Sequence, residues 1–203
     1  MRWLLLAVLV LAPPTAGQPM QAEVQDPAGD TDFSPTEAPA PDLRSVAVAM
    51  SPAGELILGA RFTRGTFQPT ATYVQFNLDL GRTESDPCAQ CGNYLVDYNG
   101  IGKPSRKAQV QRLGLNGRYE VAATVPVTVT ADRIRIVVPE RLLPKDISRV
   151  AFGVVAGVKL GDDALSVILD RAPDSGMPRS VLDVPGGRTR HIWTPPVKKK
   201  SKR

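Results

Sequence analysis

Hydrophobic and polar residues alternate with a period of two along most of the chain between residues 42 and 169. The clearest run is 71–80, in which Val74, Phe76, Leu78 and Leu80 fall on one side of an extended chain. Because successive side chains of a strand point to opposite faces, this run predicts a strand with one buried face. Its polar members are predicted to form a ligand face: Tyr73, Gln75, Asn77 and Asp79.

Eight further segments are predicted strands separated by turn residues; most alternate, whereas 149–158 is nearly continuous in apolar and small residues, as in a strand covered on both faces. These segments are 43–50, 55–62, 93–98, 107–113, 118–125, 133–138, 149–158 and 164–169. Asn116-Gly117 favours a tight hairpin because both residues tolerate a positive φ. Only 139–143 indicates a helical turn, and no long amphipathic segment occurs. About nine short strands predict an all-β fold, an antiparallel β-sandwich, with a barrel as the alternative.

The two ends of the chain differ in composition from this body. Arg2 precedes nine apolar residues, 3–11, and small residues follow them, which is typical of a signal peptide over 1–22. Nine residues are too few for a transmembrane helix, which needs about 20. The sequence therefore predicts a secreted or periplasmic protein without a transmembrane segment. The sandwich domain is expected over 23–177, and a disordered Pro/Gly/basic tail over 178–203.

The net charge of +5 is concentrated in the tail. Lys198, Lys199, Lys200, Lys202 and Arg203 are five of the last six residues, and without them the body is close to neutral. A specific nucleic-acid partner is therefore not expected. The tail is interpreted as a solvated end, with weak attraction to an anionic envelope component as the alternative.

Two acidic turns bracket the predicted strands. Asp26, Asp30 and Asp32 precede them, and Asp170 and Asp174 follow the last one. Calcium takes six to eight oxygen ligands from carboxylates and carbonyls, and loops rich in Asp and Gly supply both. The five aspartates are therefore a candidate calcium site if the chain ends meet. In the alternative interpretation they only shape turns, since Asp beside Pro or Gly accepts main-chain hydrogen bonds.

A lone CxxC motif occupies a polar loop. In an oxidising compartment, Cys88 and Cys91 predict a small structural disulfide. No zinc site is expected, because there is no second CxxC and the single histidine, His191, is about 100 residues away. No haem is expected either, because Met50 is predicted to be buried and Met177 and His191 fall at the end of the domain or beyond it.

Few residues favour catalysis. The one histidine of the sequence, His191, falls beyond the predicted domain. The domain therefore cannot build a Ser-His-Asp or Cys-His arrangement. Asp79 and Asp97 lie on predicted strands, and a glycosidase needs only two carboxyl groups about 5–10 Å apart. Acids on the solvent face of a strand are far commoner than such pairs, so no enzymatic activity is expected.

The order of five short motifs resembles the family-9 carbohydrate-binding-module-like, DOMON-related sandwich domains of secreted bacterial proteins. The resemblance covers 23–177, and the order and spacing of the motifs carry it. The motifs are Asp26-Pro-Ala-Gly-Asp30, Pro41-Asp42-Leu43, Phe76-Asn77-Leu78-Asp79, Asn93-Tyr94-Leu95-Val96 and Asp170-Arg-Ala-Pro-Asp174-Ser-Gly176.

The resemblance implies a non-catalytic module, because such domains bind carbohydrate, calcium or haem, or have no known ligand. The chain departs from the sugar-binding members in its scarcity of exposed aromatic residues, since Trp193 in the tail is the only tryptophan after the signal peptide. We expect an exported binding or interaction module for a carbohydrate or envelope component, stabilised by calcium. The alternatives are a purely structural exported protein and a weak glycoside hydrolase.

Overall fold

The computed structural model describes residues 20–32, 39–81, 92–103, 105–145, 147, 149–160, 165–172, 180–183 and 189–191. These residues form twelve strands and one short 3-10 turn, η1 (Glu140–Leu142). The predicted all-β antiparallel fold with one short helical turn is therefore confirmed. The strands are β1 (Met20–Gln25), β2 (Leu43–Met50), β3 (Leu56–Phe62), β4 (Thr72–Leu80), β5 (Tyr94–Asn99), β6 (Lys107–Leu113), β7 (Tyr119–Val129), β8 (Arg133–Val138), β9 (Arg149–Leu160), β10 (Leu165–Ala172), β11 (Ser180–Asp183) and β12 (Thr189–His191).

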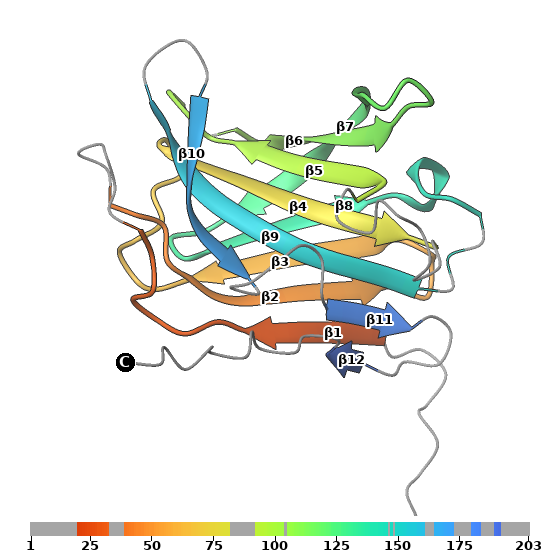
Figure 1. Ribbon diagram of the computed structural model, residues 1–203, viewed down its shortest axis with the longest axis horizontal. Coiled ribbons are helices and arrows are strands. Elements are labelled where there is room, and N and C mark those ends of the chain that lie inside the picture. The colour runs from red at the N-terminus through yellow and green to blue at the C-terminus, as the bar shows by residue number, and fades with distance from the viewer. Residues whose placement is uncertain are drawn as a thin grey trace, which may run out of the picture.

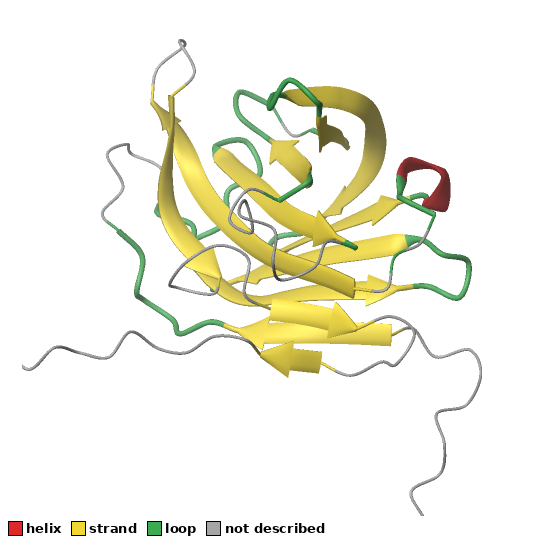
Figure 2. Ribbon diagram, turned by 45° about the vertical axis from the view of Figure 1, so that its right-hand side comes forward, coloured by secondary structure: helices red, strands yellow, loops and turns green. Residues whose placement is uncertain are grey.

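One continuous sheet folds over on itself (Figures 1 and 2). The long strand β7 pairs with β6 through its first part and with β8 through its end, so it belongs to both halves. One half contains β1, β2, β3 and β8, and the other contains β6, β5, β4 and β9. β10 and β11 share the free edge of β9, and β12 follows β11. The architecture is thus a sandwich whose layers are joined at one side, partway to the barrel alternative.

A single hydrophobic core fills the space between the two halves. Val74, Phe76, Leu78 and Leu80 are all buried, as their alternation predicts. β9 is buried on both faces, which agrees with its nearly continuous apolar sequence. No helix in the described ranges is long and apolar enough to cross a bilayer.

Three strands lie outside the nine predicted segments. β1 pairs with β2 ahead of the first predicted strand, and β11 and β12 fall within the segment assigned to the tail. β11 is ordered by its ladder to β9, and Leu182 at its centre is fully buried. β11 and β12 contain too few apolar residues to show a period. β1 does alternate, with Ala22 and Val24 buried and Gln21, Glu23 and Gln25 exposed, and this signal was missed.

Two β-bulges shape one end of the molecule. In β2 the pairing with β3 shifts between Leu43 and Ser45, and in β10 the pairing with β9 shifts between Ile168 and Asp170. A bulge adds one residue to a strand and re-aims the side chains beside it. Leu169 and Asp170 are consequently both buried, although they are consecutive.

Candidate functional site

Three of the predicted aspartates meet at the bulged end of the sheet. Each of Asp26, Asp30 and Asp170 contributes a carboxylate oxygen, and these oxygens all lie within 4.8 Å of one another. Asp26 follows β1, Asp30 lies in the next turn, and Asp170 lies on β10. Asp26 and Asp170 are buried, whereas Asp30 is exposed, so the group opens to solvent on one side. We call these three residues the acidic cluster.

The main chain of the first turn is fixed at both ends. The Asp26 N–H donates to the carbonyl of Arg44 at 3.0 Å, which ties the turn to the bulge of β2. The Asp32 N–H donates to the carbonyl of Leu169 at 2.8 Å, which ties it to the bulge of β10. Gly29, with φ +80°, supplies the left-handed residue that reverses the chain between them.

A fourth aspartate, Asp42, supports this turn and was not among the residues predicted for the site. It is 5% exposed, and its Oδ2 accepts the Gly29 N–H at 3.0 Å. Its Oδ1 is buried and has no hydrogen-bond partner among the described residues. A buried carboxylate oxygen is costly unless a donor, a proton or a cation satisfies it. Asp42 directly precedes β2, and the antiparallel pairing of β1 and β2 places it at the same end as Asp26.

Asp170 is held by main-chain donors and influenced by its neighbours. The N–H of Leu43 donates to its Oδ2, and the N–H of Arg171 donates to its Oδ1 at 2.7 Å. The pKa of Asp170 is raised to about 7: burial raises it most, the two hydrogen bonds lower it, and the charges of Asp30 and Asp42 raise it. Burial, together with these neighbouring carboxylates, therefore favours the protonated form of Asp170 near neutral pH, and a bound cation would favour the ionised form.

The remaining predicted site residues have different positions. Asp32 is exposed and its carboxylate lies outside the acidic cluster, although it lines a cavity of about 550 Å³ together with Asp30 and Asp170. Asp174 and the predicted disulfide partners Cys88 and Cys91 fall outside the described residues. The structure thus brings together three of the five predicted carboxylates and places Asp42 beside them.

The predicted ligand face on β4 is partly closed. Tyr73 and Gln75 are half-buried, but Asn77 and Asp79 are only 3% and 6% exposed. Asp97, opposite Gln75 on β5, accepts a hydrogen bond from the Tyr73 hydroxyl at 3.3 Å. Burial raises the pKa of Asp97, and hydrogen bonds to its side chain oppose that rise. A cavity of about 390 Å³ beside Tyr73 and Asp97 is the part of this face that is open.

The strand register separates the two acids considered for glycoside hydrolysis. Asp97 is paired with Gln75, and Asp79 lies four residues further along β4. At about 3.3 Å per residue, this places the two residues roughly 13 Å apart along the strand. Glycosidases hold their carboxyl groups no more than about 9.5 Å apart, so this spacing of the main chain argues against such a pair.

Comparison of the chain with protein-family models, with curated proteins and with solved structures finds no match. The resemblance to family-9-like sandwich domains therefore stays a prediction, and the functional argument rests on the geometry of the site.

Proposed function

We propose that this protein is a non-catalytic binding module whose bulged end is stabilised by a divalent cation, with calcium as the ion that fits best. The observation that supports this proposal is the acidic cluster together with the buried Oδ1 of Asp42, which has no partner among the described residues. Like charges brought this close repel one another, and a cation offsets that repulsion while supplying the missing partner.

The donor set and its spacing favour calcium over zinc. Every side-chain ligand in the cluster is a carboxylate, and the described part of the chain places no cysteine or histidine side chain among them. Calcium–oxygen distances are about 2.3–2.6 Å, so ligand oxygens on opposite sides of one ion lie about 5 Å apart. A mutual spacing within 4.8 Å is compatible with a single ion between the three side chains.

The ligand class follows from the predicted location of the protein and from the resemblance to family-9-like sandwich domains. An exported module with this architecture would bind a carbohydrate or another envelope component, as the resemblance implies. The separation of Asp79 from Asp97 supports a binding role over hydrolysis.

A thermal melt in EDTA and then in millimolar calcium tests the cation. A ligand at 100 times its dissociation constant adds about 2.7 kcal/mol, which corresponds to a rise of roughly 5–10 °C for a chain of this size. Asp30→Asn should abolish most of the rise, because Asp30 is the exposed member of the cluster and its replacement leaves the core intact. Asp32→Asn is the matched control, since its carboxylate lies outside the cluster. An equal rise in both variants, or no rise in the parent, contradicts the proposal.

A purely structural role for the same aspartates is the second candidate. The hydrogen bonds from Gly29 to Asp42, and from Leu43 and Arg171 to Asp170, favour it, because these carboxylates hold turns without any ion. It predicts melting temperatures that are independent of calcium but sensitive to replacement of Asp42 or Asp170.

A further inference from the structure

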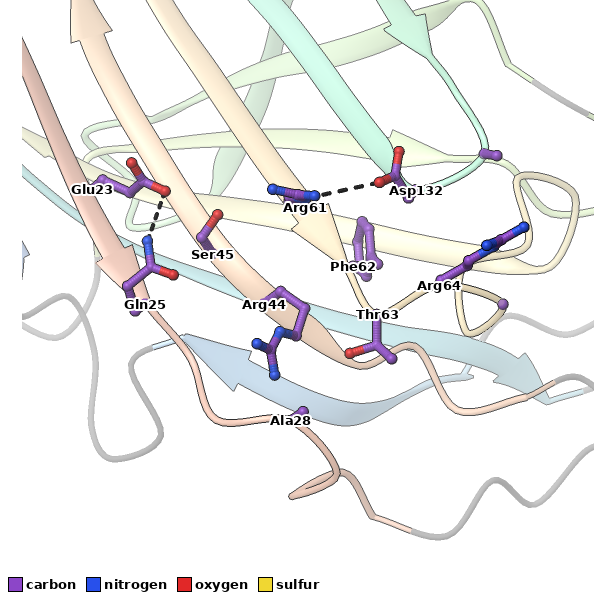
Figure 3. Close-up of a pocket in the computed structure, with 12 residues that line it drawn as sticks. Glu23, Gln25, Ala28, Arg44, Ser45, Arg61, Phe62, Thr63, Arg64 and Asp132 are labelled. Carbon is purple, nitrogen blue, oxygen red and sulfur yellow. Dashed lines mark hydrogen bonds and ion pairs between the residues drawn. The ribbon is translucent and has the colours of Figure 1, made fainter.

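The outer face of the half-sheet formed by β1, β2, β3 and β8 carries a long depression. It consists of two cavities, of about 770 and 350 Å³, which share Glu23, Ser45 and Arg61 in their walls and are therefore continuous. Figure 3 shows the larger cavity, with Arg44, Arg61 and Arg64 on different sides of it. We call the whole depression the arginine trough, after the residues of its walls: Arg44, Arg61, Arg64, Arg133 and Arg135.

Most residues on the floor of the trough are small, although Ile57 of β3 also lines it. Ser45, Ala47 and Ala49 of β2 lie on it beside Gly59 of β3. The bulge of β2 adds Arg44 to the same face: Leu43 and Val46 point into the core, and the two residues between them both line the larger cavity. A regular strand would have turned one of these two inward.

The walls carry excess positive charge. The five arginines face only two carboxylates, Glu23 and Asp132, although the body of the protein is nearly neutral. Asp132 lies 3.8 Å from Arg61 and 3.5 Å from Arg133, and these two side chains are more than half exposed. Such exposed pairs are weak, so the guanidinium groups can exchange Asp132 for another anion. Arg44, Arg64 and Arg135 have no ion pair with any residue that the structure describes.

The arginines are arranged in rows along the strands. Arg61 is paired with Arg133, and Gly59, two residues away along β3, is paired with Arg135. Successive rows are therefore about 7 Å apart. This arrangement suits a linear ligand that presents an anionic group at regular intervals, because each guanidinium fork can bind one carboxylate with two hydrogen bonds.

We propose that the arginine trough binds an extended polysaccharide bearing carboxylates, that is, a chain containing uronic acids. The small residues of the floor let sugar rings approach the sheet closely, and the arginines of the walls pair with their carboxylates. Glu23 and Asp132 in the walls repel a polymer as densely charged as a sulfated glycan, which favours about one charge per sugar.

Other polyanions fit the trough less well. Single-stranded nucleic acid binds by stacking its bases on exposed aromatic rings, and the one aromatic residue of the lining, Phe62, is 2% exposed. An acidic peptide gains affinity by adding a strand to a sheet edge, whereas the trough lies on a sheet face whose main chain is already paired.

This inference deepens the proposed binding function and rests on it for the non-catalytic role, but it does not require the cation. Binding of short oligogalacturonates to the full chain should therefore be measured by calorimetry in EDTA and again with the cation site loaded. Calcium-dependent melting without oligogalacturonate binding overturns the trough proposal alone. Binding in EDTA without any effect of calcium on melting overturns the cation proposal alone.

The decisive variant is Arg44→Gln/Arg61→Gln/Arg135→Gln. We expect it to lose at least about tenfold in affinity, with an unchanged melting temperature because all three side chains are exposed. The matched control, Arg118→Gln/Arg141→Gln/Lys145→Gln, removes the same charge from exposed positions outside the trough and should bind like the parent. An equal loss in both variants would show attraction by net charge, and undiminished binding in both would assign the binding to another part of the chain, such as the basic tail; either result would overturn the proposal.

Three further probes test the ligand class. Neutral maltooligosaccharides should not bind. Heparin oligosaccharides or single-stranded DNA that bind more tightly than oligogalacturonate, and lose affinity in the trough variant, would assign the trough to a sulfated glycan or a nucleic acid and overturn the uronate proposal.

Discussion

The acidic cluster and the arginine trough are two concentrations of like charge, built on opposite sides of the same bulge. The carbonyl of Arg44 anchors the acidic turn, and its side chain lines the trough. The two regions differ in burial: Asp26 and Asp170 are each 5% exposed, whereas Arg61 and Arg133 are more than half exposed. Buried charges affect folding stability and their own pKa values. Exposed charges contribute little to stability and remain available to bind a ligand. Substitutions in the two regions should therefore differ in what they change.

The largest effect on stability is expected at Asp170. Asp170→Ala at pH 5 in EDTA, where this carboxyl is neutral, removes the acceptor of the Leu43 and Arg171 N–H groups. Leaving these donors without a partner should destabilise the protein by about 2–3 kcal/mol in urea unfolding. Asp170→Asn keeps one acceptor oxygen, so only one of the two donors loses its partner, and it should cost about half as much. Equal losses in the two variants would contradict this role of the hydrogen bonds.

The pH dependence of stability should be the next largest effect. A carboxyl whose folded pKa is about 7 binds a proton more tightly in the folded state than in the unfolded state. Its stabilising contribution is complete below the ordinary pKa near 4 and is lost as the pH rises through 7. Without cation, the melting temperature should fall by roughly 10 °C over that interval.

Calcium should oppose this fall in melting temperature, because the ion binds the ionised carboxylates of the cluster. Asp170→Asn should make the melting temperature less dependent on pH. The groups that face Asp170, namely Asp26, Asp30 and Asp42, are retained in that variant, so the change is attributable to Asp170. A parent protein whose melting temperature is constant from pH 4 to 8 would argue against the raised pKa.

Arg44→Ala separates the two regions at their shared residue. The acidic turn uses only the main-chain carbonyl of Arg44, whereas the trough uses its guanidinium group. The variant should keep the full calcium response and lose about threefold to tenfold in affinity for oligogalacturonate. Loss of the calcium response instead would mean that the side chain itself holds the bulge.

The smallest effect is expected for Arg61→Gln on stability. Its pair with Asp132 is 3.8 Å long, and the arginine side chain is 57% exposed. Urea unfolding should change by less than about 0.5 kcal/mol. If Arg61→Gln lowered the free energy of unfolding as much as Asp170→Ala, burial would not be what distinguishes the two regions.

The sequence predicted the three residues of the acidic cluster, but it did not predict the arginine trough. Aspartates beside Pro and Gly at the two ends of a strand series predict that Asp26, Asp30 and Asp170 can converge. Asp42 was missed as a site residue, although it directly precedes a predicted strand, because its role depends on accepting the Gly29 N–H across the turn. The trough depends on which strands are neighbours, and β3 pairs with β8 across more than 70 residues of sequence.

The sequence by itself determined where nine of the twelve strands lie and which side of most of them faces the core, because a period of two reflects one buried face. It also indicated a hairpin at Asn116-Gly117, although the structure joins β6 and β7 by a five-residue connection, 114–118, rather than a two-residue turn. The tertiary structure alone decided the pairing order, the burial of Asn77 and Asp79, and the two bulges. The physical reason is that the local period of a strand depends only on which of its faces is buried. Strand pairing, register shifts and the burial of outward-facing side chains depend on residues distant in sequence.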